Sequence, residues 1–199
     1  MAKTTKKRTG RRVLHAVLGT VAALIAAAFV FVLVQQPPEK TYLPEAKARA
    51  LAQEALTRYG AQSTSPLWGA NAVLDGCFPL YDLREQVCQY TYFVAENGTR
   101  VGSINVMADV ENPYAVGEPT PGLSPYDAFA QQALGRRIKP QEHLYRIDMS
   151  PYPVALRNGD GTYTVIPGEN MAAQQIPAWN FWLACKAQLA MGRVMAWIG

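Results

Sequence analysis

The sequence predicts an α+β fold, in which one N-terminal transmembrane helix is followed by a single domain with an antiparallel sheet packed by helices. An uncharged apolar segment, a series of strand patterns and two flanking helical patterns support this prediction. The expected organisation is a basic cytoplasmic leader over 1–12, a transmembrane helix over 13–34, a spacer over 35–44 and an extracytoplasmic domain over 45–199.

Charge is distributed unevenly along the chain. The 199 residues carry a net charge of +4, but six basic residues and no acidic residue occupy the first twelve positions. The remainder is therefore mildly acidic, which argues against nucleic acid as a partner of the globular part. The six basic residues are Lys3, Lys6, Lys7, Arg8, Arg11 and Arg12.

Residues 13–34 contain no Asp, Glu, Lys or Arg. A helix over this run extends about 33 Å, which is enough to cross the bilayer core. The alternative is a cleaved signal peptide, whose apolar region is shorter and ends at small residues. A cut after Ala28 would leave the apolar stretch 29–34 at the new N-terminus, so an uncleaved anchor is favoured. The basic leader predicts a cytoplasmic N-terminus and an extracytoplasmic domain at the cell membrane.

The spacer over 35–44 is short and contains proline, so we expect the domain to lie close to the bilayer. Pro44 then opens a predicted helix that Gly60 closes. Apolar residues recur in it every three or four positions, which predicts one face packed on the domain. These residues are Leu43, Ala46, Ala50, Leu51, Ala55 and Tyr59.

The elements that follow are short. Strands are predicted over 77–81, 87–95 and 100–108, and then over 144–149, 153–156 and 162–166. Between the two groups, an irregular proline-rich segment over 111–125 leads into a helix from Pro125 to Leu134, closed by Gly135. A turn is expected over 158–161, and a final helix begins at Pro177 and runs to the C-terminus.

The turn at Asn97-Gly98 allows two registers for the second and third strands. A two-residue turn pairs Tyr92 with Ser103, whereas a three-residue loop pairs Tyr90 with Ile104. The three-residue loop is favoured because it gathers apolar residues on one face, which the first helix would cover. That face consists of Cys88, Tyr90, Tyr92, Ile104 and Val106.

Three cysteines are present, Cys77, Cys88 and Cys185. Outside the cytoplasm one disulfide is permitted, and Cys77 and Cys88 are neighbours along the first predicted hairpin. They face each other only if the turn is tight, because Cα atoms more than about 7 Å apart cannot be bridged. A Cys77–Cys88 disulfide and a pair of small buried hydrophobes both stay open. Paired cysteine and histidine motifs are lacking, so no metal or cofactor is expected.

Cys185 and His143 form the one nucleophile and base pair that the composition allows, since the second histidine lies in the apolar segment. A thiol is activated at the N-terminus of a helix, but Cys185 falls inside one. A packed core cysteine is therefore favoured, and a thiol enzyme using Cys185 and His143 is kept as an alternative.

The final helix combines tryptophans with cations along one stripe. This stripe consists of Trp179, Trp182, Lys186, Arg193 and Trp197. Such a pattern is typical of a helix that lies at the membrane interface or contacts a partner. In the alternative interpretation, the tryptophans pack into the domain while the cations extend into solvent.

The segments 79–83, 90–94, 97–98 and 101–106 resemble the propeptide module of streptopain-like cysteine peptidases and related secreted bacterial proteins. The resemblance covers roughly residues 45–122 and implies a helix followed by an antiparallel sheet. In those families the propeptide covers a protease active site, so the resemblance implies a binding or inhibitory role. No Cys-His protease domain follows this module, and no catalytic residue is carried over.

The sequence therefore favours a membrane-anchored extracytoplasmic module that binds a protein or serves as an accessory subunit, without catalysis. A peptidase-propeptide-like inhibitor and the thiol enzyme are the alternatives. The bilayer would be contacted through residues 13–34. Small residues in this segment, among them Gly19, Ala23 and Ala27, would also permit close contact with another membrane helix.

Overall fold

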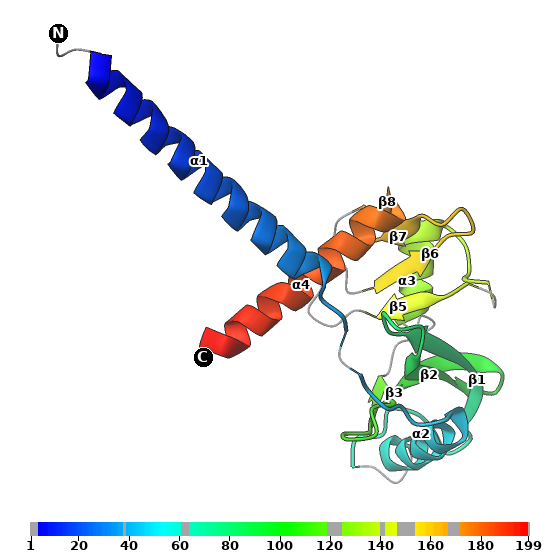
Figure 1. Cartoon of the computed structure of the whole chain (residues 1–199). Helices are drawn as coiled ribbons and strands as arrows, with labels where there is room; N and C mark the ends of the chain where they lie inside the picture. Colours follow the sequence, from blue (N-terminus) through cyan, green and yellow to red (C-terminus); the bar gives the residue numbers. More distant parts are fainter. Residues whose placement is uncertain are drawn as a thin grey trace. The chain divides into compact units, whose positions relative to one another are not determined.

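The computed structural model describes residues 4–37, 39–60, 64–118, 125–139, 142–146, 154–166 and 172–198, with side chains described from residue 17 in the first helix and from 129 in the third. These residues form an α+β structure with four helices and eight strands (Figure 1). The chain separates into two compact units. One contains residues 1–36 and 182–199, and the other contains residues 37–181.

The first unit contains α1 (Thr4–Leu33) and most of α4 (Ala178–Ile198). Every residue of α1 from 17 to 31 is exposed. Within the described part of the chain, no helix has the combination of length and apolar character that crossing a membrane requires. The expected transmembrane helix over 13–34 is therefore not supported by the described helices. The side chains of the basic leader lie outside the described residues.

The second unit is built on one sheet in the order β4-β3-β2-β1-β5-β6-β7-β8. Its strands are β1 (Val73–Tyr81), β2 (Val87–Glu96), β3 (Thr99–Met107), β4 (Tyr114–Glu118), β5 (Leu144–Arg146), β6 (Val154–Arg157), β7 (Tyr163–Val165) and β8 (Gln174–Ile176). The strands over 77–81, 87–95 and 100–108 are thus confirmed, and so are cores of the three later ones. Their expected ends at 147–149 and 153 lie outside the described residues.

The sheet is mixed, so the prediction of a purely antiparallel sheet is wrong in one place. Tyr81 of β1 pairs with Tyr145 of β5 in parallel, while the other pairings are antiparallel. A parallel pair requires a crossover connection. After β4 the chain forms α3 (Pro125–Leu134) and then adds β5 to the free edge of β1.

Two short strands were not predicted. β4 lies inside the segment expected to be irregular. The strand can form there because Pro113 precedes it and so does not interrupt its hydrogen bonds to β3. β8 has two glutamines and one buried apolar residue, Ile176, and so lacks an alternating apolar pattern. Both strands exist because a neighbouring strand supplies hydrogen-bond partners, which their own composition does not reveal.

The first predicted helix is confirmed as α2 (Glu45–Tyr59), with Pro44 before it and Gly60 after it. Its buried face, however, differs from the one expected, because Ala46 and Ala50 are exposed. The residues of α2 that are buried are Ala48, Ala52, Ala55 and Leu56. Three alanines bring the helix backbone close to the sheet, where the helix joins a core with residues of β2 and β3.

The register between β2 and β3 is neither of the two considered. Asn97 and Gly98 both have positive φ, 50° and 78°, which a two-residue hairpin turn of the favoured twist requires. A bulge then places Val94 opposite Gly102 and Tyr92 opposite Ile104, with Val101 as the extra residue. The preference for the three-residue loop was therefore wrong.

The bulge explains why the expected apolar face still forms. Tyr90, Tyr92, Ile104 and Val106 lie in one buried cluster with the alanines of α2. Cys88 is the exception, because it belongs to another cluster with Leu80, Leu144 and Phe129 of α3. The first helix therefore covers the face formed by β2 and β3, as predicted, except at Cys88.

Close approach between α2, Trp68 and β4 depends on Gly117. A Cβ atom at this position would lie 2.7 Å from the indole of Trp68 and 2.8 Å from the ring of Tyr59. The Trp68 side chain is held in place because its Nε1 donates a hydrogen bond to the Leu56 carbonyl at 3.0 Å. The ring therefore has little freedom to move away from an added methyl group.

We expect Gly117→Ala to lower the free energy of unfolding by about 1–3 kcal/mol, the range for overpacked cores. Denaturant unfolding followed by tryptophan fluorescence measures the change. Gly159→Ala is the matched control, since a Cβ there meets nothing within 4 Å. Equal stability of the two variants would contradict the close packing at Gly117.

Candidate functional site

The C-terminal end of α1 meets α4, and two cations of α4 bind it. Lys186 Nζ donates a hydrogen bond to the Leu33 carbonyl at 2.6 Å, and Arg193 Nη2 donates one to the Gln36 carbonyl at 3.1 Å. Leu33 is the last residue of α1. Figure 1 shows α4 beside this end of α1. We refer to this arrangement of Leu33, Gln36, Lys186 and Arg193 as the helix junction.

The chemistry of the helix junction follows from the ends of helices. The last carbonyls of an α-helix lack partners within the helix and carry partial negative charge. Two side-chain cations supply both donors and opposite charge. Lys186 and Arg193 are seven residues apart, or about two turns, and therefore lie on the same side of α4. Ala190 lies between them and is buried, which allows the close approach.

Gln35 completes the junction, although no pattern in the sequence indicates this role. Its side chain is 2% exposed, and its Nε2 donates a hydrogen bond to the Phe31 carbonyl at 2.6 Å. Thus the carbonyls of Phe31, Leu33 and Gln36 each receive a side-chain donor. A glutamine in a polar spacer has no pattern that indicates capping.

The tryptophans of the predicted stripe are placed differently from the cations. Trp179 and Trp197 are 69% and 89% exposed, whereas Trp182 is half-buried. The structure therefore brings Lys186 and Arg193 together at the end of α1 and leaves Trp197 in solvent. The predicted stripe is one face of α4, but its cations bind backbone carbonyls, Lys186 that of Leu33 at the end of α1 and Arg193 that of Gln36 just beyond it.

A separate apolar face runs along the second half of α4. Its residues recur at helical spacing and are all exposed, and they are Ala187, Met191, Val194, Met195 and Ile198. We call them the apolar face of α4. Acidic residues are absent from α4, so the helix combines this face with two cations on another side.

A second group of polar residues centres on Glu85, in the turn between β1 and β2. Its carboxylate accepts a hydrogen bond from the Tyr145 hydroxyl and lies 3.2 Å from His143 Nδ1. Arg157 Nη1 lies 3.6 Å from the same carboxylate. The ring of His143 stacks on Tyr81 with 4.1 Å between centroids. The group thus joins the β1–β2 turn, β5 and β6.

Local backbone geometry places Glu85 in this group. Its φ is 61°, in the left-handed region that non-glycine residues rarely adopt. Asp82 maintains the turn, because its carboxylate accepts hydrogen bonds from the backbone N–H groups of Arg84 and Gln86. Strained residues of this kind are retained where the surrounding contacts determine them.

The Glu85 group stabilises the joint of the sheet. Burial and the hydrogen bond to Glu85 raise the pKa of Tyr145 well above its ordinary value. The backbone pairing of β1 with β5 consists of the single pair Tyr81 and Tyr145, and Leu80 and Leu144 of the two strands share one buried cluster. Charged and stacked contacts from Glu85 and His143 strengthen this otherwise short pairing.

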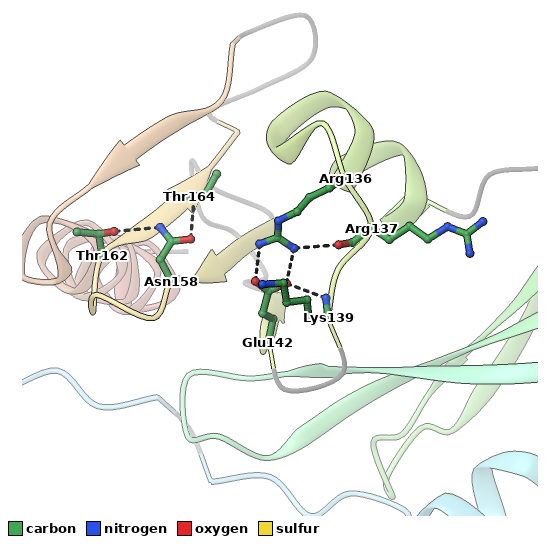
Figure 2. A network of polar contacts seen from close by, with 7 residues as sticks. All are labelled: Arg136, Arg137, Lys139, Glu142, Asn158, Thr162 and Thr164. Carbon is green, nitrogen blue, oxygen red and sulfur yellow. Dashed lines mark hydrogen bonds and ion pairs between the residues drawn. The ribbon is translucent and has the colours of Figure 1, made fainter.

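An ion pair fixes the segment just before His143. Arg136 forms two hydrogen bonds with the Glu142 carboxylate, which also accepts one from the backbone N–H of Lys139 (Figure 2). Arg136 follows Gly135, the residue that ends α3, and Glu142 precedes β5. The pair therefore ties the end of α3 to the start of β5. Figure 2 also shows Asn158 bonded to Thr162 and Thr164 in the next turn.

The cysteines do not form the disulfide left open above. None of the three is in a disulfide in the structure, and Cys77 lies opposite Tyr92. Cys88 is four residues further along β2, about 13 Å away and beyond bridging distance. Burial, together with the charge of Glu45, raises the pKa of the Cys77 thiol to about 11.

Cys185 and His143 have separate surroundings. Cys185 is 1% exposed inside α4, and His143 contacts Tyr81 and Glu85. A buried thiol within a helix is protected from substrates and lacks the activation found at a helix N-terminus. These surroundings favour a packed core cysteine. Among the described residues, no cluster of three acidic, histidine or cysteine side chains is arranged to bind a metal ion.

Comparisons with known proteins give no relative. No protein-family model matches the chain, and neither a curated protein nor a solved structure matches it. The functional interpretation therefore rests on the geometry of the two units described above.

We expect Glu142→Gln to destabilise the protein at pH 7, and to do so less as the pH falls and Glu142 becomes protonated. The hydrogen bonds from Arg136 lower the pKa of Glu142, so its contribution to stability is present above the unfolded pKa. That contribution is lost as pH falls through the lower, folded pKa. The expected decrease in Tm at pH 7 is about 2 °C.

Thermal unfolding at several pH values, followed by circular dichroism, measures this effect. The control is Glu111→Gln, at an exposed carboxylate away from Arg136. A Tm difference between wild type and Glu142→Gln that stays the same from pH 7 down to an acid pH at which Glu142 is protonated would show that the ion pair is not its cause.

Proposed function

We propose that the protein is a membrane-anchored extracytoplasmic module that binds another protein or serves as an accessory subunit, without catalysis. The observation that carries the proposal is the exposure of α1. Large apolar side chains cover all sides of it, and Leu24, Ile25 and Phe29 are 66%, 65% and 53% exposed. Such a helix requires an apolar environment.

Transfer of α1 from water into lipid is favourable. Each large apolar side chain gains about 1.5–3 kcal/mol when it leaves water. From residue 17 to 34, ten large apolar side chains of this segment are exposed. The uncharged run over 13–34 is long enough for a bilayer, and the six basic residues before it favour a cytoplasmic N-terminus. Residues 37–181 would then lie outside the cytoplasm.

The proposed surface for the protein partner is the outer edge of β4. This strand is the last of the sheet and pairs with β3 on one side. Tyr114 and Val116 alternate along it and are 46% and 39% exposed. An edge strand offers backbone hydrogen bonds to an extended segment of another protein, and exposed apolar side chains add contact area.

One alternative function has support in the fold. α2 followed by the β1, β2 and β3 meander agrees with the arrangement that the resemblance to peptidase propeptides implies. An inhibitor of this kind would bind a protease as its partner, which is a special case of protein binding. The burial of Cys185 argues against the thiol enzyme.

A membrane helix offers a further partner surface. A Cβ added at Gly19 meets nothing within 4 Å, so this side of α1 is open to a second helix. Ala23, Ala26 and Ala27 are also exposed, and small residues allow helices in a membrane to approach closely. The accessory-subunit role is therefore compatible with contacts from both units.

We expect Leu24→Arg combined with Ile25→Arg to release the full chain from membranes. Each charge at the centre of a membrane helix costs about 2.5–3.5 kcal/mol. Resistance to alkaline carbonate extraction measures anchoring, and Leu24→Ala with Ile25→Ala is the matched control. Wild-type protein that carbonate extracts completely would contradict the anchor.

We expect Val116→Asp to abolish a discrete cross-linked adduct that the wild-type chain forms in its native membranes. A charge at this position opposes an apolar contact on the β4 edge. Val73→Asp is the control, since Val73 is 57% exposed on β1 and away from β4 in the strand order. Adducts that persist equally in both variants would place the partner elsewhere.

A further inference from the structure

We propose that α4 lies in the membrane interface, with its apolar face in contact with lipid and its cations on the end of the anchor. This inference rests on the proposed function, because it takes α1 as the membrane anchor. It goes further by assigning α4 a binding surface and a bilayer as the occupant. The observations that carry it are the helix junction and the exposure of the apolar face of α4.

The helix junction sets the depth of α4 relative to the bilayer. Leu33 ends α1, and Lys186 and Arg193 bind the carbonyls of Leu33 and Gln36. With a cytoplasmic N-terminus, this end of α1 is where the anchor leaves the hydrocarbon on the outer side. The second half of α4 belongs to the same compact unit as α1. The hydrogen bonds therefore keep that half of α4 at the outer boundary of the bilayer.

The exposed side chains in the second half of α4 are suited to the membrane interface. Met191, Met195 and Ile198 are 54%, 66% and 70% exposed on the apolar face. Trp197 is 89% exposed near the end of the helix, and tryptophan is enriched where membrane meets water. Helices with an apolar face, a cationic side and no acidic residue lie about 5–10 Å into the boundary between headgroups and acyl chains.

Length and charge exclude a second membrane crossing by α4. Lys186 and Arg193 divide its 21 residues, so no uncharged stretch in it is long enough to span the hydrocarbon. If α4 lies in the plane of the membrane, only one of its sides is buried in lipid. An orientation in the plane of the membrane therefore satisfies both the cations and the apolar face.

The test uses the full chain in vesicles of phosphatidylcholine and phosphatidylglycerol. A fluorophore is attached to one introduced cysteine in a Cys77→Ala background, because Cys88 and Cys185 are buried. The labelled variants are Met195→Cys on the apolar face of α4, Leu24→Cys in α1, and Gln53→Cys as a control on the exposed side of α2. Lipids with a quencher at the headgroup or deep in the acyl chain report depth.

We expect the label at 195 to be quenched more strongly by the shallow lipid than by the deep one. The label at 24 should show the reverse order, and the label at 53 should resemble water-exposed dye. A water-like label at 195, with the label at 24 still deep, would overturn the inference and leave the anchor intact. A water-like label at both positions would remove the anchor as well.

Two other outcomes would also overturn the inference. A label at 195 as deep as the one at 24 would mean that α4 inserts fully. A label at 195 that is protected but insensitive to lipid quenchers, and that responds to protein density, would mean that a second copy covers the face.

The helix junction has its own variant. Lys186→Gln with Arg193→Gln removes the charged donors to the end of α1, so shallow quenching at 195 should fall while deep quenching at 24 is unchanged. Lys47→Gln with Arg137→Gln removes the same charges from exposed sites of the other unit. An unchanged profile at 195 in the first variant would refute the role of the junction in setting the depth.

Discussion

The hydrogen bonds from α4 to the end of α1 are the constraint on which the first unit depends. An apolar helix can satisfy its internal backbone groups, but its last carbonyls need donors from outside. Lys186 and Gln35 supply donors to the carbonyls of Leu33 and Phe31, and Arg193 binds the carbonyl of Gln36 just beyond the helix. Because Lys186 and Leu33 are 153 residues apart, these contacts connect the two ends of the chain. The first unit therefore needs the C-terminal helix as well as the N-terminal one.

The second unit is stabilised differently, by the close packing of a helix on a sheet. Ala48, Ala52 and Ala55 are fully buried, and small side chains let the backbone of α2 approach β2 and β3. Gly117 extends the same close packing to β4. At the other side of the sheet, β5 joins β1 through a single residue pair, and the Glu85 group supports that joint. Apolar packing thus stabilises the half of the sheet beside α2, and the β1–β5 joint combines polar contacts with the buried cluster of Leu80 and Leu144.

Local signals in the sequence account for most of the elements and for few of the contacts between them. Pro44 and Gly60 bound α2, and Asn97-Gly98 forms a turn, because capping and turn preferences act over a few residues. The bulge at Val101 and the parallel β1–β5 pair depend on neighbours far along the chain. The stripe of Lys186 and Arg193 was predicted as a face, but a periodic pattern cannot show that the carbonyls of α1 lie opposite it.

The two cations of α4 attach this helix to the end of α1 and also orient its apolar face. The rotation of α4 about its axis sets the direction of its apolar face, and Lys186 and Arg193 help to set that rotation. Their bonds to the Leu33 and Gln36 carbonyls fix that rotation, because two contacts two turns apart define one side of a helix. The direction of Met191 and Met195 relative to the end of α1 is then also fixed. The backbone carbonyls at the end of α1 therefore set the position of the apolar face of α4 relative to the membrane that would surround α1.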